Sequence, residues 1–193
     1  MLSLLSVVSF AQAAHLEAKA WLGQLLIARA WQQQLRGIEA PRPWPWADTQ
    51  PVARLQVPTL GVDLIVLAGG TGYTLAWGPG HLAGTAPLGA PGNAVVSGHR
   101  DTHFAFLRDL VVGTELRVQD GAGRWHPYRV TRSFVTHERD PRVVAASEGS
   151  RLTLVTCWPF DALLPGGTDR YVVVAQQIDP TAGRPAGSHR ADR

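Results

Sequence analysis

Glycine and proline divide the chain after Val52 into short segments, and this division limits the folds that it can adopt. The 193 residues include 20 glycines and 14 prolines. The segments between them are apolar or alternate at period two, as Leu116 and Val118 do against charged neighbours. Both patterns are typical of β-strands. The predicted strands are Val52–Pro58, Val62–Gly69, Asn93–His99, Thr114–Asp120, Arg124–Thr136, Arg151–Cys157 and Arg170–Ile178.

Many short strands joined by tight turns favour an all-β barrel or sandwich, with one short helix predicted at His103–Leu110. The chain is 45% hydrophobic and 17% charged, which excludes collagen-like and disordered classes. Its net charge is +3 and its sequence pI is about 9.6. Lysine and arginine do not gather with aromatic residues on one element, so no nucleic-acid partner is expected.

The chain begins with an apolar, uncharged segment, Met1–Ala14. Within it Ala11–Ala13 resembles a small-residue cleavage site. A membrane span requires about 20 apolar residues, whereas His15, Glu17 and Lys19 interrupt this segment. Three interpretations stay open: a short or truncated membrane anchor, a cleaved signal, and an amphipathic helix packed on the domain. The first two imply export.

Proline marks the boundary between the N-terminal segment and the strands. The X-Pro steps that follow Gly37 favour extended backbone, so the N-terminal helix is expected to end near Arg36. The predicted organisation is an anchor or signal with a helix at 1–36, a Pro/Trp-rich linker at 37–51, a β-domain at 52–178 and a disordered tail at 179–193.

Cys157 is the one cysteine of the chain, so no disulfide can form within it. Most free cysteines are buried and inert, and composition alone therefore favours a structural thiol. The position favours a reactive one. Cys157 ends a predicted strand, and Pro159 cannot continue a β-ladder. A thiol at the rim of a barrel can reach a substrate while a rigid scaffold holds it.

A cysteine nucleophile needs a nearby base and a group that stabilises an oxyanion. His99 ends a predicted strand, and His103 is the alternative base. Arg170 begins the last predicted strand, so pairing with the Cys157 strand would make the two side chains neighbours. The structural alternatives are a surface histidine in a loop and an arginine at the edge of a strand.

No metal site and no cofactor are predicted. The histidines are not at ligand spacing with a second cysteine. The segment Gly78–Gly89 is rich in glycine but lacks the Lys-Ser/Thr pair and the following helix of a phosphate-binding loop. We interpret this segment as turns.

Several segments, in this order along the chain, resemble the sortases. The sequence TLVTC (residues 153–157) is similar to their TLxTC cysteine motif, and GHRDTHFAFLRDL (98–110), with the run before it, to their histidine segment. The sequence RYVVVA (170–175) is similar to their arginine strand. Residues 156–175 resemble the type found in Gram-negative proteobacteria, which is often paired with one dedicated target. The resemblance covers about residues 46–178.

The resemblance implies a closed sortase-type β-barrel of about eight strands, with short helices and an N-terminal helix or anchor. It implies that Cys157 attacks the Thr-Gly bond of an LPxTG-like C-terminal sorting signal and that the resulting thioacyl group passes to an amine. His99 would protonate the departing amine and take a proton from the incoming one. Arg170 would hydrogen-bond the oxyanion or the substrate carbonyl.

The resemblance also extends to the surroundings of these three residues. The loops His137–Ser150 and Trp158–Asp169 would select the peptide. Close relatives often have tyrosine in place of Trp158, so the edge of the cleft differs there. The further candidate residues, for substrate binding or support, are Thr156, Trp158, His103 and Asp101.

The implied partner is a dedicated target protein with a C-terminal LPxTG-like signal, and the resemblance does not identify the amine acceptor. The N-terminal segment fits the membrane anchor of the family, which implies the cell inner membrane with the catalytic domain on its periplasmic side. Two alternatives stay open. One is a cysteine peptidase that releases the acyl group to water, and the other is a non-catalytic β-barrel binding module with a buried thiol.

Overall fold

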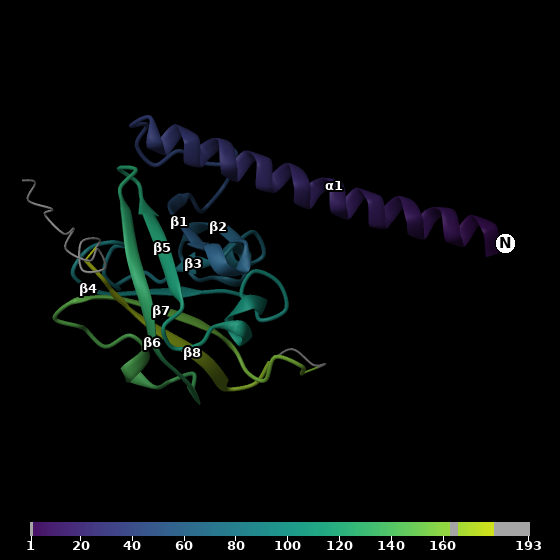
Figure 1. The fold of residues 1–193 in the computed structure, drawn as a ribbon. Helices are drawn as coiled ribbons and strands as arrows, with labels where there is room; N and C mark the ends of the chain where they lie inside the picture. Colours follow the sequence, from purple (N-terminus) through teal and green to yellow (C-terminus); the bar gives the residue numbers. More distant parts are fainter. Residues whose placement is uncertain (1, 163–165, 180–193) are drawn as a thin grey trace, which may run out of the picture.

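The computed structural model describes residues 2–162 and 166–179, with side chains from residue 18 onwards. A long helix leads into a β-barrel, and the N-terminal part of this helix projects well beyond the barrel (Figure 1). The elements are α1 (Leu2–Leu35), β1 (Pro51–Val57), η1 (Pro58–Leu60), β2 (Val62–Ala68), α2 (Gly72–Leu75), β3 (Gly80–His81), β4 (Gly92–Ser97), η2 (Ala105–Asp109), β5 (Glu115–Asp120), β6 (Trp125–His137), η3 (Pro141–Val143), β7 (Ser150–Cys157) and β8 (Asp169–Gln177).

The described strands form a closed barrel in the order β1-β2-β3-β4-β7-β8-β6-β5. Strand β2 pairs in parallel with β3, and β4 pairs in parallel with β7; the other neighbours are antiparallel. Closure removes the free sheet edges that would otherwise pair with other chains. The prediction of an all-β closed barrel of about eight strands is confirmed.

Strand β7 is buried on both faces from Leu152 to Thr156, and apolar or β-branched residues occupy all of these positions. Leu152 and Leu154 point into the barrel and pack in its interior core. Val155 points outwards and packs with Val172 of β8 in a second cluster on the outer surface. Figure 1 shows the loop between β6 and β7 beside this part of the sheet. The outer face of β7 is therefore a second packing surface.

Four short elements, η1, α2, β3 and η3, were not predicted, and the strand predicted at Asn93–His99 ends earlier than expected. The segment Gly78–Gly89 contains the two-residue strand β3, and α2 precedes it. Strand β4 ends at Ser97, two residues before His99. The prediction that His99 ends a strand is wrong by these two residues, because the chain enters a turn there in which the amide of Phe104 donates to the carbonyl of His99 at 2.9 Å.

The C-terminal part of α1 packs on the barrel, whereas the exposed Trp21 and Leu22 do not. Ile27, Ala30 and Trp31 are buried, and the helix ends at Leu35, one residue before the predicted end. Among the described residues, no helix combines the length and the apolar character that a membrane crossing requires.

The segment between α1 and β1 lies against the barrel. Pro41, Pro43 and Ala47 are buried, and the hydroxyl of Thr49 donates a hydrogen bond to the carbonyl of Ala68 at 2.7 Å. The predicted disordered tail falls, from residue 180 on, outside the described residues. The buried residues of this segment and the bond from Thr49 to Ala68 connect α1 to the β-domain through an ordered arm.

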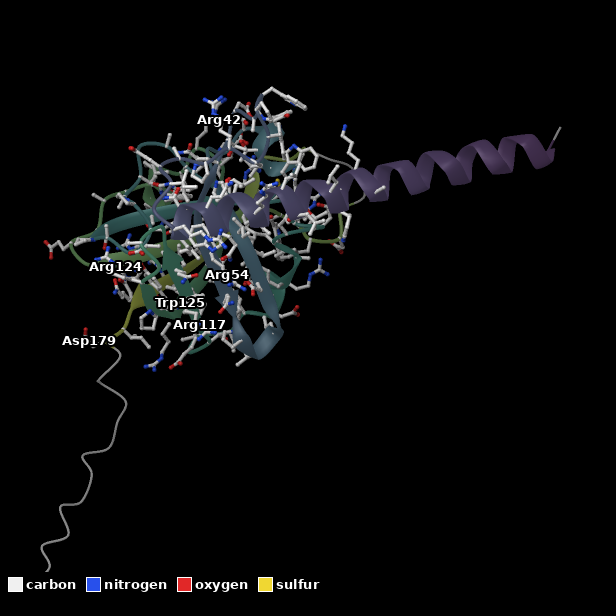
Figure 2. All side chains as sticks on the ribbon, turned by 90° about the horizontal axis from the view of Figure 1, so that it is seen from above. Arg42, Arg54, Arg117, Arg124, Trp125 and Asp179 are labelled. Carbon is white, nitrogen blue, oxygen red and sulfur yellow. The ribbon has the colours of Figure 1, made fainter. Side chains whose placement is uncertain are left out.

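Polar side chains run across the outer face of β2, β1, β5 and β6. The guanidinium of Arg54 donates to both carboxylate oxygens of Asp63, and these bonds lower the pKa of Asp63. Arg117 donates to Gln56 at 2.7 Å, and its guanidinium lies 4.7 Å from the ring centre of Trp125. Arg54, Arg117 and Trp125 follow one another on this face (Figure 2). This face is a solvated polar surface.

Candidate active site

Cys157 and Arg170 lie directly opposite each other in the antiparallel pair of β7 and β8. Side chains of such a pair lie on the same face, with their Cβ atoms about 4.5–5.5 Å apart. Both residues lie at the end of the outward-facing row that contains Val155 and Val172. Cys157 is a free, half-buried thiol, and Arg170 is half-buried as well. The two strands therefore pair, which is the condition under which the sequence makes these side chains neighbours.

His99 follows the strand that neighbours β7 on its other side. Strands β4 and β7 run in parallel with Ser97 opposite Val155, and the amide of Gly98 donates to the carbonyl of Val155 at 3.1 Å. The register of these strands, continued by two residues, brings the exposed His99 beside Cys157. The ends of β4 and β7 and the start of β8 therefore meet at one edge of the barrel.

Thr156 connects the cysteine strand to the histidine strand. Its side chain is 2% exposed, and its hydroxyl donates to the carbonyl of Gly98 at 2.7 Å. Gly98 accepts this bond one residue before His99, and Thr156 donates it one residue before Cys157. The hydroxyl thereby fixes the distance between the two strand ends.

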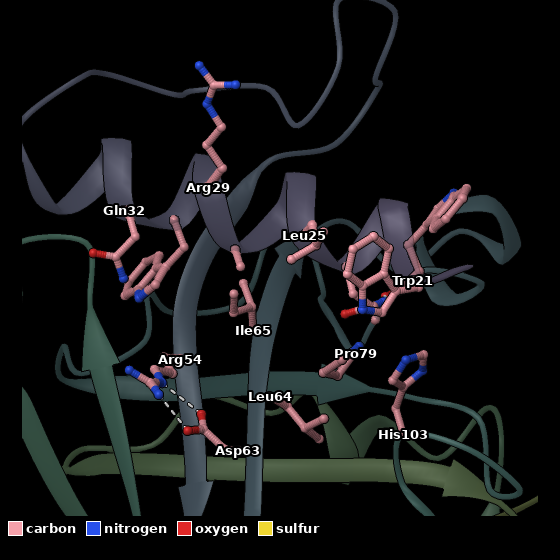
Figure 3. A pocket seen from close by; sticks show the side chains of 15 residues that line it. Trp21, Leu25, Arg29, Gln32, Arg54, Asp63, Leu64, Ile65, Pro79 and His103 are labelled. Carbon is pink, nitrogen blue, oxygen red and sulfur yellow. Dashed lines mark hydrogen bonds and ion pairs between the residues drawn. The ribbon is translucent and has the colours of Figure 1, made fainter. Parts of the chain in front are cut away.

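His103 lies in the wall of a cavity of about 530 Å³ between α1 and the outer face of β1 and β2. Figure 3 shows its imidazole at one end of this cavity, near Pro79 and Trp21. Burial lowers the pKa of His103, and the charge of the nearby His99 lowers it further. Both effects disfavour the charged form of His103.

The guanidinium of Arg170 is held by three oxygen atoms. Nη1 donates to the carbonyls of Gly167 and Asp169 at 2.7 and 2.9 Å. Nη2 donates to the carboxylate of Glu138, with which it forms an ion pair at 2.5 Å. Glu138 lies in the loop between β6 and β7, Gly167 lies in the loop between β7 and β8, and Asp169 is the first residue of β8. The arginine side chain is thus fixed in the absence of a substrate.

Aromatic side chains close the barrel next to Cys157. The ring of Trp158 stacks on Tyr171 with centroids 5.7 Å apart, and Phe160 contacts both rings. The guanidinium of Arg108 lies 4.8 Å from the ring centre of Phe160. Trp158 therefore forms part of a packed cluster at the base of the loop that follows Cys157.

The loop between β6 and β7 is fastened to the outer face of the sheet by Asn93. This side chain is 3% exposed, and its Nδ2 donates to the carbonyls of Val143 and Ala145 at 2.9 and 3.0 Å. Its Oδ1 accepts a hydrogen bond from the hydroxyl of Thr153 at 2.7 Å. The loop is thereby held beside the row of side chains that ends at Cys157.

Asp140 fixes the start of the same loop. Its carboxylate accepts hydrogen bonds from the backbone and the guanidinium of Arg142 and from the hydroxyl of Thr136. The bonds from Arg142, and then that from Thr136, hold the pKa of Asp140 well below its ordinary value. The carboxylate of Asp140 is therefore charged near neutral pH.

The two residues after His99 differ in their surroundings. Arg100 is 9% exposed, and its Nη2 donates to the carbonyl of Ala162 at 3.1 Å, so it connects the histidine segment to the loop that follows Cys157. Asp101 is exposed, and its side chain makes no hydrogen bond or ion pair with another described residue. The structure therefore gives Asp101 no contact that would support the site.

Sequence reasoning missed Asn93, Arg100 and Glu138, which all hold loops around the site. Each makes its contact across 32 to 62 residues of sequence, mostly to backbone carbonyls that no sequence motif marks. One signal was present: Asn93 is the one asparagine of the chain, in a strand that is otherwise apolar. A buried amide in such a strand requires partners for its donors and its acceptor.

A family model described as sortase domain matches residues 55–178. Sortase D of Bacillus subtilis (strain 168) is 26% identical over 125 residues, which cover 64% of this chain and 62% of that relative. The chain therefore spans less than two thirds of that curated relative.

Solved structures show the same similarity. The catalytic domain of B. anthracis SrtD is 31% identical, with a TM-score of 0.58 and coverage of 67% of this chain and 88% of that one. The Clostridium perfringens Sortase D5 transpeptidase is 25% identical, with a TM-score of 0.61 and coverage of 79% and 89%. Sortase A from Corynebacterium diphtheriae, at 23% identity, a TM-score of 0.63 and coverage of 84% and 87%, shares the fold.

Proposed function

Because the chain belongs to the sortase family, we propose that it is a cysteine transpeptidase that cleaves an LPxTG-like C-terminal sorting signal and transfers the new carboxyl end to an amine. The observation that carries this proposal is the meeting of three strand ends. Cys157 and Arg170 are paired residues of β7 and β8, and His99 follows the strand that runs in parallel with β7.

In the first half of the reaction, the Cys157 thiolate attacks the carbonyl carbon of the Thr-Gly bond. The carbonyl oxygen gains negative charge, and the guanidinium of Arg170 donates a hydrogen bond to it. The C–N bond then breaks, and His99 gives a proton to the departing amine. The products of this half are a thioester on Cys157 and a peptide with a free amino group.

In the second half, an incoming amine attacks the thioester carbonyl and His99 takes its proton. The C–S bond breaks, Cys157 leaves as the thiolate, and a new amide bond joins the two substrates. This sequence regenerates the starting protonation states of His99 and Cys157. The alternative of a cysteine peptidase differs in one reagent, because water attacks the thioester in place of the amine.

The remaining assignments belong to the same proposal. The loops between β6 and β7 and between β7 and β8 flank Cys157 and would select the peptide of one dedicated target protein. The projecting N-terminal part of α1 supports attachment to the inner membrane, with the barrel on the periplasmic side. Thr156 and Trp158 support the site by holding the two strand ends and the loop base.

The experiment is to incubate the full chain with LPxTG-like peptides and an amine and to analyse the products by mass spectrometry. The expected product carries the added amine, and Cys157→Ala forms none. Equal cleavage by Cys157→Ala would refute the proposal. A product with a free carboxyl group, formed even at saturating amine, would assign the chain as a peptidase.

Two histidine variants identify the base. His99→Ala is expected to abolish turnover and His103→Ala only to weaken it, because His103 lies in the wall of the neighbouring cavity and not at the strand ends that meet at Cys157. The opposite result would assign the base to His103. A non-catalytic binding module is tested separately by alkylation: its buried thiol would react slowly at every pH, and Arg170→Lys would leave that rate unchanged.

A further inference from the structure

Glu138 is placed where it controls the orientation of Arg170. It follows directly after β6, whose last residue, His137, lies opposite Asp169 in the ladder with β8. Its carboxylate accepts a hydrogen bond from Nη2 of Arg170. The carbonyls of Gly167 and Asp169 hold Nη1 from the opposite loop. The guanidinium plane is therefore fixed by acceptors on two separate segments.

The number of donors shows what this arrangement leaves for a substrate. A guanidinium has five N–H groups in a rigid plane, and three of them meet Glu138, Gly167 and Asp169. The Nε–H and one N–H of Nη2 make no hydrogen bond with another residue in the described part of the chain. Because the plane is rigid, fixing three donors also fixes the direction of the other two.

Glu138 also joins the two loops that flank Cys157. Its backbone amide donates to the carbonyl of Thr168 at 2.6 Å, while its side chain binds Arg170. The side chains of Arg170 and Glu138 are 23% and 36% exposed, so water screens their charges. An ion pair that is exposed to this degree adds little to stability. Its principal effect is to restrict the orientation of a long, flexible side chain.

We propose that Glu138 is a positioning residue: it holds the guanidinium of Arg170 so that two of its N–H groups are directed to the substrate oxygen, and it closes the β6–β7 loop onto the β7–β8 loop. This inference rests on the proposed function, in which Arg170 stabilises the oxyanion. Glu138 itself does not touch the reacting atoms.

Activity measurements separate orientation from charge. In the full chain, Glu138→Ala removes the acceptor and is expected to lower kcat at least ten-fold while KM changes less than two-fold, because Arg170 acts in the transition state. Glu138→Gln keeps an acceptor oxygen and is expected to recover most of kcat. Glu115→Ala is the matched control, since Glu115 forms an exposed ion pair of the same kind with Arg129 at 2.6 Å and lies outside the loops that flank Cys157.

A decrease in kcat that is less than two-fold, or equal to that of Glu115→Ala, would overturn the proposal. An increase in kcat for Glu138→Ala would overturn it too, because Glu138 would then restrain Arg170. An increase in KM with unchanged kcat would assign Glu138 to peptide binding and refute the positioning role.

A measurement without substrate keeps this test independent of the proposed activity. The Nε–H of Arg170 can be observed by ¹⁵N NMR and assigned through its loss in Arg170→Lys. A fixed guanidinium is expected to give a sharp, slowly exchanging signal that broadens in Glu138→Ala and persists in Glu115→Ala. If the wild-type chain shows this signal but transfers no peptide, the proposed function fails and the positioning of Arg170 stands. If the signal is the same in both variants, the positioning fails.

Discussion

Replacement of Asn93 by alanine tests whether one buried amide holds the β6–β7 loop in place. Asn93 makes three hydrogen bonds: Nδ2 donates to the carbonyls of Val143 and Ala145, and Oδ1 accepts from Thr153. Alanine removes all three bonds. It leaves the hydroxyl of Thr153, which is 1% exposed, without a partner. The substitution should therefore reduce stability and release the loop.

The size of both effects follows from the number of bonds. Each hydrogen bond contributes about 1 kcal/mol net, so Asn93→Ala should lower the free energy of unfolding by about 3 kcal/mol. For a chain of this size about 1 kcal/mol corresponds to about 2–4 °C in Tm, and Tm should fall by about 6–12 °C. The two bonds to the loop, about 2 kcal/mol together, limit the increase in KM for the peptide to about 30-fold.

Thr153→Val is the control that separates the two effects. Valine has nearly the same shape and removes one bond to Asn93, but the amide still holds Val143 and Ala145. This variant should lower Tm by about 2–4 °C and leave KM unchanged. Thermal unfolding and peptide kinetics measure both quantities. A decrease in Tm of less than about 3 °C for Asn93→Ala, together with an unchanged KM, would refute the role of Asn93 as the fastening of the loop.

Two further predictions concern the strand ends and the loop. Thr156→Val removes the bond to Gly98 and should lower the free energy of unfolding by about 1 kcal/mol and also lower kcat; an unchanged Tm and kcat would contradict the link between the strand ends. The pKa of Asp140 is lowered in the folded chain, so its carboxylate stabilises the loop above its unfolded pKa of about 3.9 and this contribution is lost as the pH falls further. Asp140→Asn should therefore flatten the acid side of the urea midpoint measured against pH, and parallel curves would contradict this.

The parts of the fold that the sequence predicted are those with a local cause. The alternation at period two in residues 115–120 and the run of apolar and β-branched residues in residues 152–156 both became strands. The pairing of Cys157 with Arg170 was a condition in the sequence analysis and not a prediction, because the twelve-residue connection is long for a plain hairpin. The catalytic roles of Cys157, His99 and Arg170 stay predictions until the variants are measured.

The parts that were missed have a distant cause. Strand β4 ends at Ser97, just before the ring of Phe104 packs against Gly98, and no local propensity marks that contact. Strand β3 has two residues, fewer than a periodic pattern requires. Glu138 is one of several charged residues after β6, and it becomes distinctive through the position of Arg170, 32 residues later.

The direction of the strands explains why such distant residues can form one site. Because β4 and β7 are parallel, their C-terminal ends reach the same edge of the barrel, and His99 and Cys157 emerge together. Because β8 is antiparallel to β7, it begins at this edge, and Arg170 is among its first residues. An antiparallel β4 would instead place His99 at the other end of β7, about 25 Å away for eight residues at about 3.3 Å each. The parallel pair is therefore the feature of the topology on which the candidate site depends, and the bond from Thr156 to Gly98 secures that pair where the chemistry would take place.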